Sequence, residues 1–480
     1  MGLVEIAASF AAAILVGTLT PTLTWDFQHR AWRTYLLLAL SVLAVYWFQP
    51  AIPLRSFDFW LPSLTLAFAV LTWFITAKAD AWREPQNRIA LLIIVALATL
   101  LDLSRYFLPK PVVTATIPPQ FVQYLVLILI LAIIIFFFFW LSHRQSWTLS
   151  FVILLIIAIL LVLKSPTLSL KVDMVFRTIT NRPIENALAS DLRWLGFSYI
   201  AFRLIHVLRD KQTNRLPELS LGEFATYVVF FPSLAAGPID RAERFAQDLR
   251  KEFKLTQDET LSAGQRIVLG LFKKFVIADA LALIALNNAL ATQVRTTGWM
   301  WIVMYAYAFQ IYFDFSGYTD IAIGIGRFVG IKLPENFAAP YLKPNITQFW
   351  NSWHMTLTQW IRSYFFNPFN RWLRGYKSIP AWMMILIGQL ATMLLIGLWH
   401  GVTVNFILWG LWHGLGLFIQ NRWSDFAKTR FNISDPRLKS ALQIGGVLLT
   451  FHFVALGWVF FALSSPSLSW MVFGKLFNLL

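Results

Sequence analysis

The chain has 480 residues, of which 58% are apolar and only 13% are charged. Soluble domains average roughly 45–50% apolar and about 25% charged residues, so this composition excludes an ordinary soluble enzyme and a disordered chain. Forty Lys and Arg against 24 Asp and Glu give a net charge of +16. Because the basic residues fall in short gaps between apolar runs, they favour a positive-inside membrane topology over nucleic-acid binding. The chain has no cysteine, which excludes disulfides and an acyl-cysteine intermediate on this protein.

Apolar runs of membrane-spanning length recur along the chain. The N-terminus is apolar, carries Glu5 and lacks a basic stretch, so we expect a retained helix near 3–20 instead of a cleaved signal. The clearest span is the charge-free run Tyr124–Ser142. Other uniform runs are Tyr35–Gln49, Phe59–Ala77, Ile89–Leu101, Thr148–Leu163, Ala381–Trp399, Val402–Gln420 and Leu442–Leu463. Less uniform candidates lie near 194–208, 221–236, 265–290, 298–315 and 318–330.

These runs predict an all-α polytopic membrane protein with about 11–14 transmembrane or re-entrant helices, each taking about 20 residues. We divide the chain into N-terminal helices at 1–165, a catalytic core at 190–465 and a C-terminal hydrophobic tail at 466–480. From about residue 191 onward, ionisable side chains lie inside or beside apolar stretches. Such groups are costly at membrane depth and usually face a bundle interior or a water-filled cavity, so chemistry or transport is expected in this region.

Four basic loops set the expected orientation of the chain. Each carries several Lys or Arg residues close to apolar runs, which is typical of the cytoplasmic side of a membrane. The loops are 209–217, 241–254, 371–377 and 422–439. We therefore expect a multi-pass protein of the cytoplasmic membrane with these loops inside.

The segment Asn345–Arg362 reads NITQFWNSWHMTLTQWIR and begins with a capping-box pattern, Asn345 followed by Gln348. A continuous helix here would place Trp350 and His354 on one face, with Trp353 beside them. An isolated histidine in such a stripe is more often a core residue with a satisfied hydrogen bond than a catalytic group.

A second histidine changes this interpretation. The run Ala381–Trp399 is followed by His400-Gly401 and then by another apolar run, so the sequence predicts a hairpin with His400 at its turn. A 19-residue helix rises about 28 Å, which places the turn deep in the membrane or at its far face. A polar turn at that depth is expected to line a cavity, and histidine suits general acid–base catalysis because its pKa is near neutrality. From these residues alone, His400 is either a general base or a residue of a structural turn.

The remaining histidines and the other motifs are interpreted as structural. His413 follows in a second GLWHG string and is expected to be a packing or hydrogen-bonding residue, as are His206 and His452. Without cysteine or an HExxH motif, no metal site is expected. The glycines of IAIGIGRFVG (321–330) are expected to allow close helix packing, and the G-x-S-x-G hydrolase elbow is absent.

Six strings together resemble the membrane-bound O-acyltransferase superfamily, in the branch that includes the alginate O-acetylation membrane protein and the D-alanyl transfer protein of teichoic acid synthesis. They occur in the family's order over roughly 195–465. The strings are FFPSLAAGPIDRAERF (230–245), GLFKKFVIAD (270–279), YFDFSGYTDIAIGIGRFVGIKLPENFAAPY (312–341), QFWNSWHMTLTQWIR (348–362), GLWHGVTVNFILWGLWHG (397–414) and GWVFF (457–461). The sequence departs from the family pattern at Ser363, where Asp is frequent, and at Ala462, where Arg is frequent.

The resemblance implies a multi-helix bundle with a funnel through the membrane, His400 as catalytic base and His354 as its partner. Trp350, Trp353, Asp314, Asp320 and Arg362 are candidates for lining the channel or contacting the acceptor. It also implies an acyl donor that is a cytoplasmic thioester, either acyl-CoA or an acyl-carrier protein, with no bound cofactor. The acceptor is expected to be a hydroxyl of an exported polysaccharide or cell-wall polymer, reached directly or through an extracytoplasmic partner transferase.

Two alternatives stay open at this stage. One is D-alanyl transfer to teichoic acid from a carrier-protein thioester. The other, of a different class, is a non-catalytic membrane transporter or scaffold, although the inverted repeats with broken helices that are typical of transporters are not found.

Overall fold

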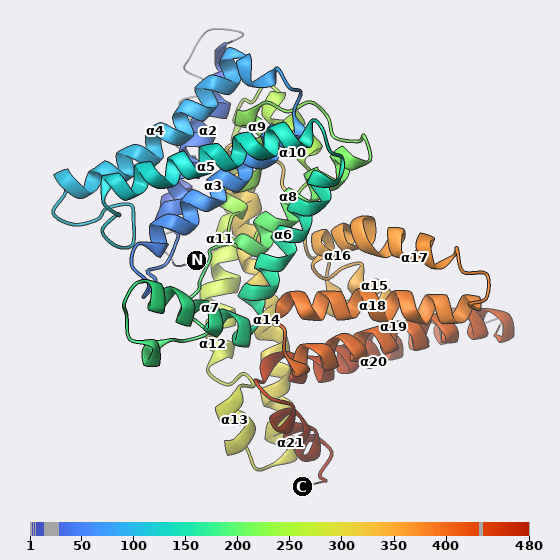
Figure 1. Ribbon diagram of the computed structural model, residues 1–480. Helices are drawn as coiled ribbons and strands as arrows, with labels where there is room; N and C mark the ends of the chain where they lie inside the picture. Colours follow the sequence, from blue (N-terminus) through green and yellow to red (C-terminus); the bar gives the residue numbers. More distant parts are fainter. Residues whose placement is uncertain (1, 3, 5, 14–27, 432–434, 480) are drawn as a thin grey trace. The chain divides into compact units, whose positions relative to one another are not determined.

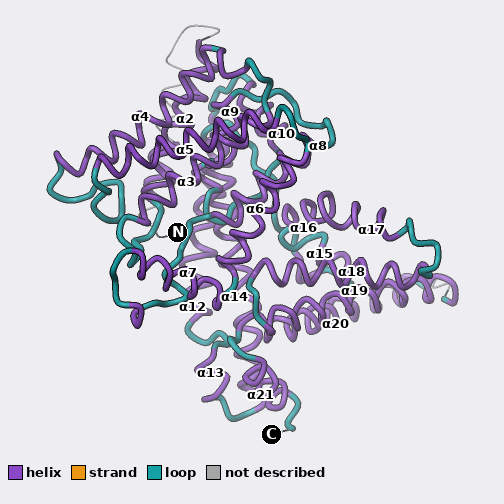
Figure 2. The backbone as a smooth tube through the Cα atoms, viewed as in Figure 1, coloured by secondary structure: helices purple, strands orange, loops and turns teal. Residues whose placement is uncertain are grey.

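The computed structural model describes residues 2–479 except 3, 5, 14–27 and 432–434. Within these residues the secondary structure is helical and contains no strand (Figure 2). Most of the predicted helix near 3–20, and part of the basic loop 422–439, lie outside the described residues. The contacts divide the chain into two units, residues 1–267 with 321–334 and residues 268–320 with 335–480.

The first unit is built from long apolar helices followed by shorter ones (Figure 1). Its helices are α2 (Gln28–Trp47), α3 (Phe57–Thr76), α4 (Pro85–Phe107), α5 (Phe121–Ser142), α6 (Trp147–Lys164), α7 (Pro166–Ile179), α8 (Phe197–Gln212), α9 (Leu221–Val229), α10 (Ala242–Arg250) and most of α11 (Gln257–Leu271). Short 3₁₀ turns occur at Ala81–Arg83 (η1), Ile184–Asn186 (η2) and Phe231–Ser233 (η3).

The second unit holds the C-terminal helices, of which the neighbours α18, α19 and α20 lie side by side (Figure 1). Its elements are the π-helix η4 (Phe272–Ala278), α12 (Asp279–Ala282), α13 (Asn288–Gln293), most of α14 (Thr297–Phe328), η5 (Pro340–Leu342), α15 (Ile346–Trp350), α16 (Met355–Ile361), the π-helix η6 (Arg362–Phe366), α17 (Asn367–Leu373), α18 (Ala381–His400), α19 (Val404–Arg430), α20 (Pro436–Ala462) and α21 (Pro466–Leu476). In the predicted tail, Lys475 of α21 donates hydrogen bonds to the carbonyls of Ala291 and Val294 at 2.8 and 2.7 Å.

The predicted membrane character is confirmed. Among the described residues, six helices are long and apolar enough to cross a membrane, and each coincides with one of the uniform runs of the sequence to within a few residues at its C-terminal end or contains it. They are α3, α4, α5, α6, α18 and α20. The other two uniform runs lie in α2 and α19 except for two residues at one end of each run. The chain is therefore an all-α, multi-pass membrane protein.

Two predicted boundaries are wrong. The runs 298–315 and 318–330 belong to one continuous helix, α14, instead of two spans. Between the two runs, Gly317 packs against the backbone where α11 passes into η4, and an added Cβ would lie 2.8 Å from the Gly270 carbonyl oxygen. The run 221–236 shows the opposite error, because it is not one helix. Helix α9 ends at Val229, and a 3₁₀ turn follows at Phe231–Ser233.

Candidate active site

The hairpin predicted around His400 is confirmed. Helix α18 ends at His400 and α19 begins at Val404, with Thr403 as its N-cap. Two glycines bring the helices into close contact: a Cβ added at Gly397 would lie 2.3 Å from the Phe406 carbonyl oxygen, and one at Gly410 would lie 2.7 Å from that of Met393. These contacts fix where α18 ends, and therefore where the His400 ring lies.

The turn after His400 is also held from the C-terminal side. Asn405 is buried, and its side-chain amide donates to the Leu463 carbonyl at 2.7 Å and to the Ser469 hydroxyl at 3.2 Å. Both partners follow the GWVFF string, so the segment after α20 and the start of α21 anchor the turn. Burying an amide with its donors satisfied is favourable, whereas leaving them unpaired would be costly.

The His400 ring lies in an aromatic enclosure but is partly exposed. Its centroid lies 4.6 Å from that of Trp399, 5.6 Å from Trp409 and 4.8 Å from Phe461, while Phe406 stacks on it at 5.9 Å. Such an apolar surrounding excludes bulk water and strengthens polar interactions with a reacting group. A partly exposed imidazole within it remains accessible to a substrate.

His354 does not lie on a continuous helix, contrary to the prediction for 345–362. Helix α15 ends at Trp350, His354 adopts a left-handed backbone conformation with φ of 42°, and α16 begins at Met355. Trp350 and His354 therefore do not share one helix face. A positive φ is uncommon outside glycine, although histidine, asparagine and aspartate are enriched there, and such strain is often found at functional sites.

Asn336 holds this strained turn in place. Its fully buried side-chain Oδ1 accepts hydrogen bonds from the Thr356 hydroxyl at 2.6 Å and from the Thr356 backbone N–H at 3.2 Å. The same oxygen lies 3.4 Å from Nδ1 of His354. Because this oxygen is an acceptor, the contact assigns the proton to Nδ1 and leaves the lone pair on Nε2. Burial lowers the pKa of His354 to about 3, so its imidazole is neutral near pH 7.

The two predicted site histidines contact the same side chain, Trp399. The Trp399 ring lies 6.3 Å from His354 and 4.6 Å from His400 between centroids. His354 also packs edge-on against Phe315 of α14 at 4.7 Å. The structure thus brings together two histidines that are 46 positions apart in the sequence, from a strained turn and from a helix end.

The predicted tryptophans lie on different sides of this region. Trp350 contacts His413 at 5.2 Å and Trp409 at 5.7 Å, whereas Trp353 packs on Trp458 at 5.1 Å. His413 is fully buried, and neither of its ring nitrogens has a hydrogen-bond partner among the described residues. Of the two structural roles expected for His413, packing and hydrogen bonding, the described contacts therefore show packing.

The ionisable candidates are paired with neighbouring side chains. Asp320 forms an ion pair with Lys273 at 2.7 Å, and Asp314 pairs with Lys274, so both carboxylates of α14 neutralise lysines of η4. The Arg362 guanidinium donates to the Asn351 side chain at 2.6 Å. These contacts give Asp314, Asp320 and Arg362 structural partners, and a role toward substrate remains a prediction for each.

Polar residues of the first unit also have structural partners. The Arg203 guanidinium donates to the Val228 carbonyl and to the Ser233 carbonyl, both at 2.8 Å. His206 lies 2.9 Å from the Asp210 carboxylate and 3.1 Å from the Tyr227 hydroxyl. The prediction that His206 is a satisfied structural histidine is confirmed.

Sequence reasoning did not single out Asn336, Trp399 and Asn405, although all three lie within or beside the strings that carry the family resemblance. Asn336 lies in LPENF, but neither its burial nor its contact with the turn at His354, 18 positions later, has a local signal in the sequence. Trp399 directly precedes His400, but its contact with His354 depends on tertiary packing and has no local signal.

Residues 134–465 match the membrane-bound O-acyltransferase family. The chain belongs to this family. The matched region covers more than half of the chain and includes His354, Asn336, Trp399 and His400. The resemblance stated from the sequence motifs is thereby confirmed, and acyl transfer is the activity class of the chain.

Curated relatives include both of the proteins named from the motifs, together with a peptidoglycan O-acetyltransferase. The chain is 33% identical over 276 residues to the teichoic acid D-alanyltransferase of Bacillus subtilis, covering 56% of this chain and 69% of that protein. It is 34% identical over 310 residues to a probable alginate O-acetylase of Pseudomonas syringae, covering 64% and 56%. It is 37% identical over 246 residues to the peptidoglycan O-acetyltransferase of Helicobacter pylori, covering 50% and 43%. The chain thus spans only about half the length of these two O-acetylating relatives.

Proposed function

We propose that the protein transfers an acyl group, with acetyl as the first candidate, from a cytoplasmic thioester to a hydroxyl of an exported polysaccharide or cell-wall polymer. The acceptor is reached directly or through an extracytoplasmic partner transferase, and the membrane is the cytoplasmic one. The observation that carries the proposal is the convergence of His354 and His400 on Trp399 in a chain of the O-acyltransferase family.

In this mechanism His400 is the general base. Its imidazole takes the proton of the acceptor hydroxyl while the hydroxyl oxygen attacks the thioester carbonyl carbon. A carbon–oxygen bond forms, the carbon–sulfur bond breaks, and the proton passes from His400 to the departing thiolate. The chain has no cysteine to hold the acyl group, so transfer is direct or uses an oxygen or nitrogen nucleophile.

His354 acts as the partner of His400. Its neutral ring, with Nδ1–H held by Asn336, offers the Nε2 lone pair as a hydrogen-bond acceptor. A lone pair orients an acceptor hydroxyl, whereas stabilising an oxyanion would need a donor at that atom. A partner histidine can either orient the acceptor or stabilise the developing oxyanion, and the lone pair on Nε2 supports orientation of the acceptor.

The test is a transfer assay with the purified chain in proteoliposomes. Acetyl-CoA carrying a labelled acetyl group and a hydroxyl-bearing polysaccharide are supplied, with and without an extracytoplasmic partner, and thiol release and labelled polymer are measured. We expect both products to appear in proportion. The proposal is wrong if neither acyl-CoA nor an acyl-carrier thioester loses its acyl group in the presence of the folded protein.

D-alanyl transfer is the second candidate. The Bacillus relative supports it, because the alignment with this chain covers 69% of that protein. The alignment with the probable alginate O-acetylase covers 56% of that relative. Supplying acetyl-CoA or a D-alanyl carrier thioester at equal concentration separates the two candidates, because the donor that is turned over identifies the acyl group.

A further inference from the structure

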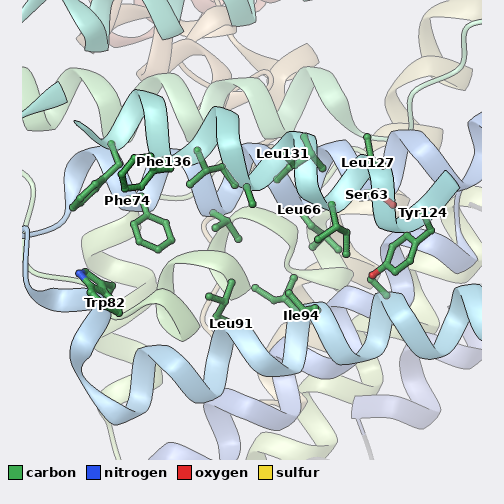
Figure 3. A pocket seen from close by; sticks show the side chains of 18 of the residues that line it. Ser63, Leu66, Phe74, Trp82, Leu91, Ile94, Tyr124, Leu127, Leu131 and Phe136 are labelled. Atoms are coloured by element: carbon green, nitrogen blue, oxygen red, sulfur yellow. The ribbon is translucent and has the colours of Figure 1, made fainter. Parts of the chain in front are cut away.

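An elongated apolar groove lies in the first unit, between α4 and α5, with α3 as its floor (Figure 3). Its volume is about 520 Å³. Most of its lining precedes residue 134, where the family match begins, so the groove is largely a feature of the N-terminal helices. The close-up shows Trp82 and Phe74 at one end and Ser63 and Tyr124 at the other.

The groove has the chemistry of a site for a hydrocarbon chain. Between its ends the lining consists of aliphatic and phenylalanine side chains, among them Leu66, Leu91, Ile94, Leu127, Leu131 and Phe136. All three helices are long and apolar enough to cross a membrane. Lipid acyl chains therefore surround the groove, and its apolar walls offer a water-excluded place for one of them.

The length of the groove matches one leaflet. Along α3 the lining runs from Ser63 to Phe74, a distance of eleven residue steps or about 16 Å of helix. The hydrocarbon core of a bilayer is about 30 Å thick, so one leaflet contributes about 15 Å. An acyl chain of ordinary length fits along such a groove without leaving its own leaflet.

The Trp82 end carries positive charge. The Arg83 and Arg88 guanidinium carbons lie 5.5 and 5.8 Å from the Trp82 ring centroid, and both side chains are exposed. Among the described residues neither guanidinium forms an ion pair. The nearby Glu84 carboxylate accepts hydrogen bonds from Gln86 and Asn87 instead. Arginine guanidinium groups are well suited to bind phosphate.

The opposite end is closed by paired hydroxyl groups. The Tyr46 and Ser63 hydroxyls lie 2.9 Å apart, and the Tyr124 and Thr99 hydroxyls lie 3.0 Å apart. Because these hydroxyls form hydrogen bonds with one another, no polar group of a ligand is needed to pair with them at this end. The charged end and the closed end together give the groove a direction.

We propose that the groove binds one acyl chain of a phospholipid, with the lipid phosphate against Arg83 and Arg88 and the methyl end of the chain toward Tyr46 and Tyr124. The headgroup belongs to the leaflet on the side of loop 209–217, because Lys78 forms an ion pair with Glu218 within the same unit. That side is predicted to be cytoplasmic. The site is independent of the proposed catalysis.

Substitutions that fill the groove test the apolar part. Ala98 and Ala132 line it, whereas Ala96, two residues away on α4, does not. The protein is purified in mild detergent, incubated with phosphatidylglycerol, and examined by native mass spectrometry. We expect wild type and Ala96→Phe to retain one phospholipid per chain, and Ala98→Phe and Ala132→Phe to lose most of it while remaining monodisperse. Because the exposed Ala132 tolerates a larger side chain, one informative variant remains if Ala98→Phe fails to fold.

The charged end is tested with a second lipid. The double variant Arg83→Gln with Arg88→Gln is compared with Arg55→Gln, an exposed arginine that has no contact with Trp82. The double variant is expected to bind phosphatidylglycerol at least tenfold more weakly, while binding of diacylglycerol with the same chains stays unchanged. Absence of bound lipid from wild type, or equal retention by Ala96→Phe and both groove-filling variants, would overturn the proposal. Equal loss of both lipids in the arginine variant would contradict the phosphate assignment.

Discussion

His354 illustrates how one backbone angle changes the interpretation of a motif. The string FWNSWHMTL has the spacing of an amphipathic helix, and the stripe through Trp350 and His354 followed from that assumption. The structure instead turns at His354, which frees its ring to contact Trp399, a residue of a different helix. Local sequence could indicate that His354 matters, but the positive φ and the contact with Asn336 arise from tertiary packing.

Stability should depend on pH through His354. An unfolded histidine has a pKa of about 6.5, and burial lowers the pKa of His354 to about 3. Between these values the unfolded chain binds more protons, so stability is greatest above the unfolded pKa and falls as the pH decreases. Thermal unfolding in detergent from about pH 7 to about pH 4.5 should show a shallower loss for His354→Gln than for wild type. Equal slopes for wild type and His354→Gln would contradict this account.

Asn336→Asp tests the hydrogen bond that orients His354. The substitution keeps an oxygen acceptor but places a carboxylate beside the ring, and a neighbouring negative charge raises a histidine pKa. If the reaction requires neutral His354, the acid limb of the pH–rate profile should move to higher pH. Asn351→Asp, which alters the partner of Arg362 instead, should leave that limb in place. Identical profiles for wild type and Asn336→Asp would show that neutral His354 is not required.

At the scale of elements, the sequence is most informative where one long apolar helix follows another. The α18–α19 hairpin was predicted from two apolar runs and the polar turn between them, and its contacts depend on Gly397 and Gly410, which each begin a GLWHG string. The continuity of α14 was not predictable in this way. Asp314 and Asp320 interrupt its apolar pattern, and the lysines that neutralise them come from another element.

Glycine substitutions should separate helix packing from helix propensity. Gly397→Ala and Gly410→Ala force a methyl group against backbone atoms at 2.3 and 2.7 Å, and such overpacking costs about 1–3 kcal/mol. Gly445→Ala on α20 meets no atom within 4 Å and should stabilise its helix by roughly 0.5–1 kcal/mol. Thermal unfolding of detergent-extracted protein measures both effects. Equal behaviour of Gly410→Ala and Gly445→Ala would contradict close packing of the hairpin.

At the scale of the molecule, composition and hydropathy predicted an all-α multi-pass membrane protein, and motif order predicted its family. Both predictions are confirmed. The division into regions 1–165, 190–465 and 466–480, the donor, the acceptor and the roles of the site residues stay predictions. Hydropathy records only how apolar a segment is, whereas these properties depend on contacts between distant residues and on molecules that bind to the chain.

The membrane orientation can be tested with single cysteines because the chain has none of its own. Asn214→Cys, Lys251→Cys, Lys377→Cys and Lys428→Cys place one thiol in each basic loop or its adjoining helix end. Positive-inside topology predicts that an impermeant thiol reagent labels none of them in intact cells and all of them after permeabilisation. Helix α4 separates Val112 from Lys78, so Val112 is expected on the opposite side of the membrane. Val112→Cys should therefore be labelled in intact cells. Labelling of any basic loop without permeabilisation would refute its assignment.

Catalysis by the paired histidines is tested most directly by acyl transfer per folded molecule. Activity is normalised to monodisperse detergent-extracted protein for His400→Ala, His354→Ala and His413→Ala. Loss of a positioned acid–base group lowers the rate by about 10²-fold or more, so the first two variants should fall by that factor per folded molecule. His413 fills a fully buried position among aromatic rings, so its variant should lose thermal stability more than turnover. Near-normal specific activity of His400→Ala would contradict its role as the general base.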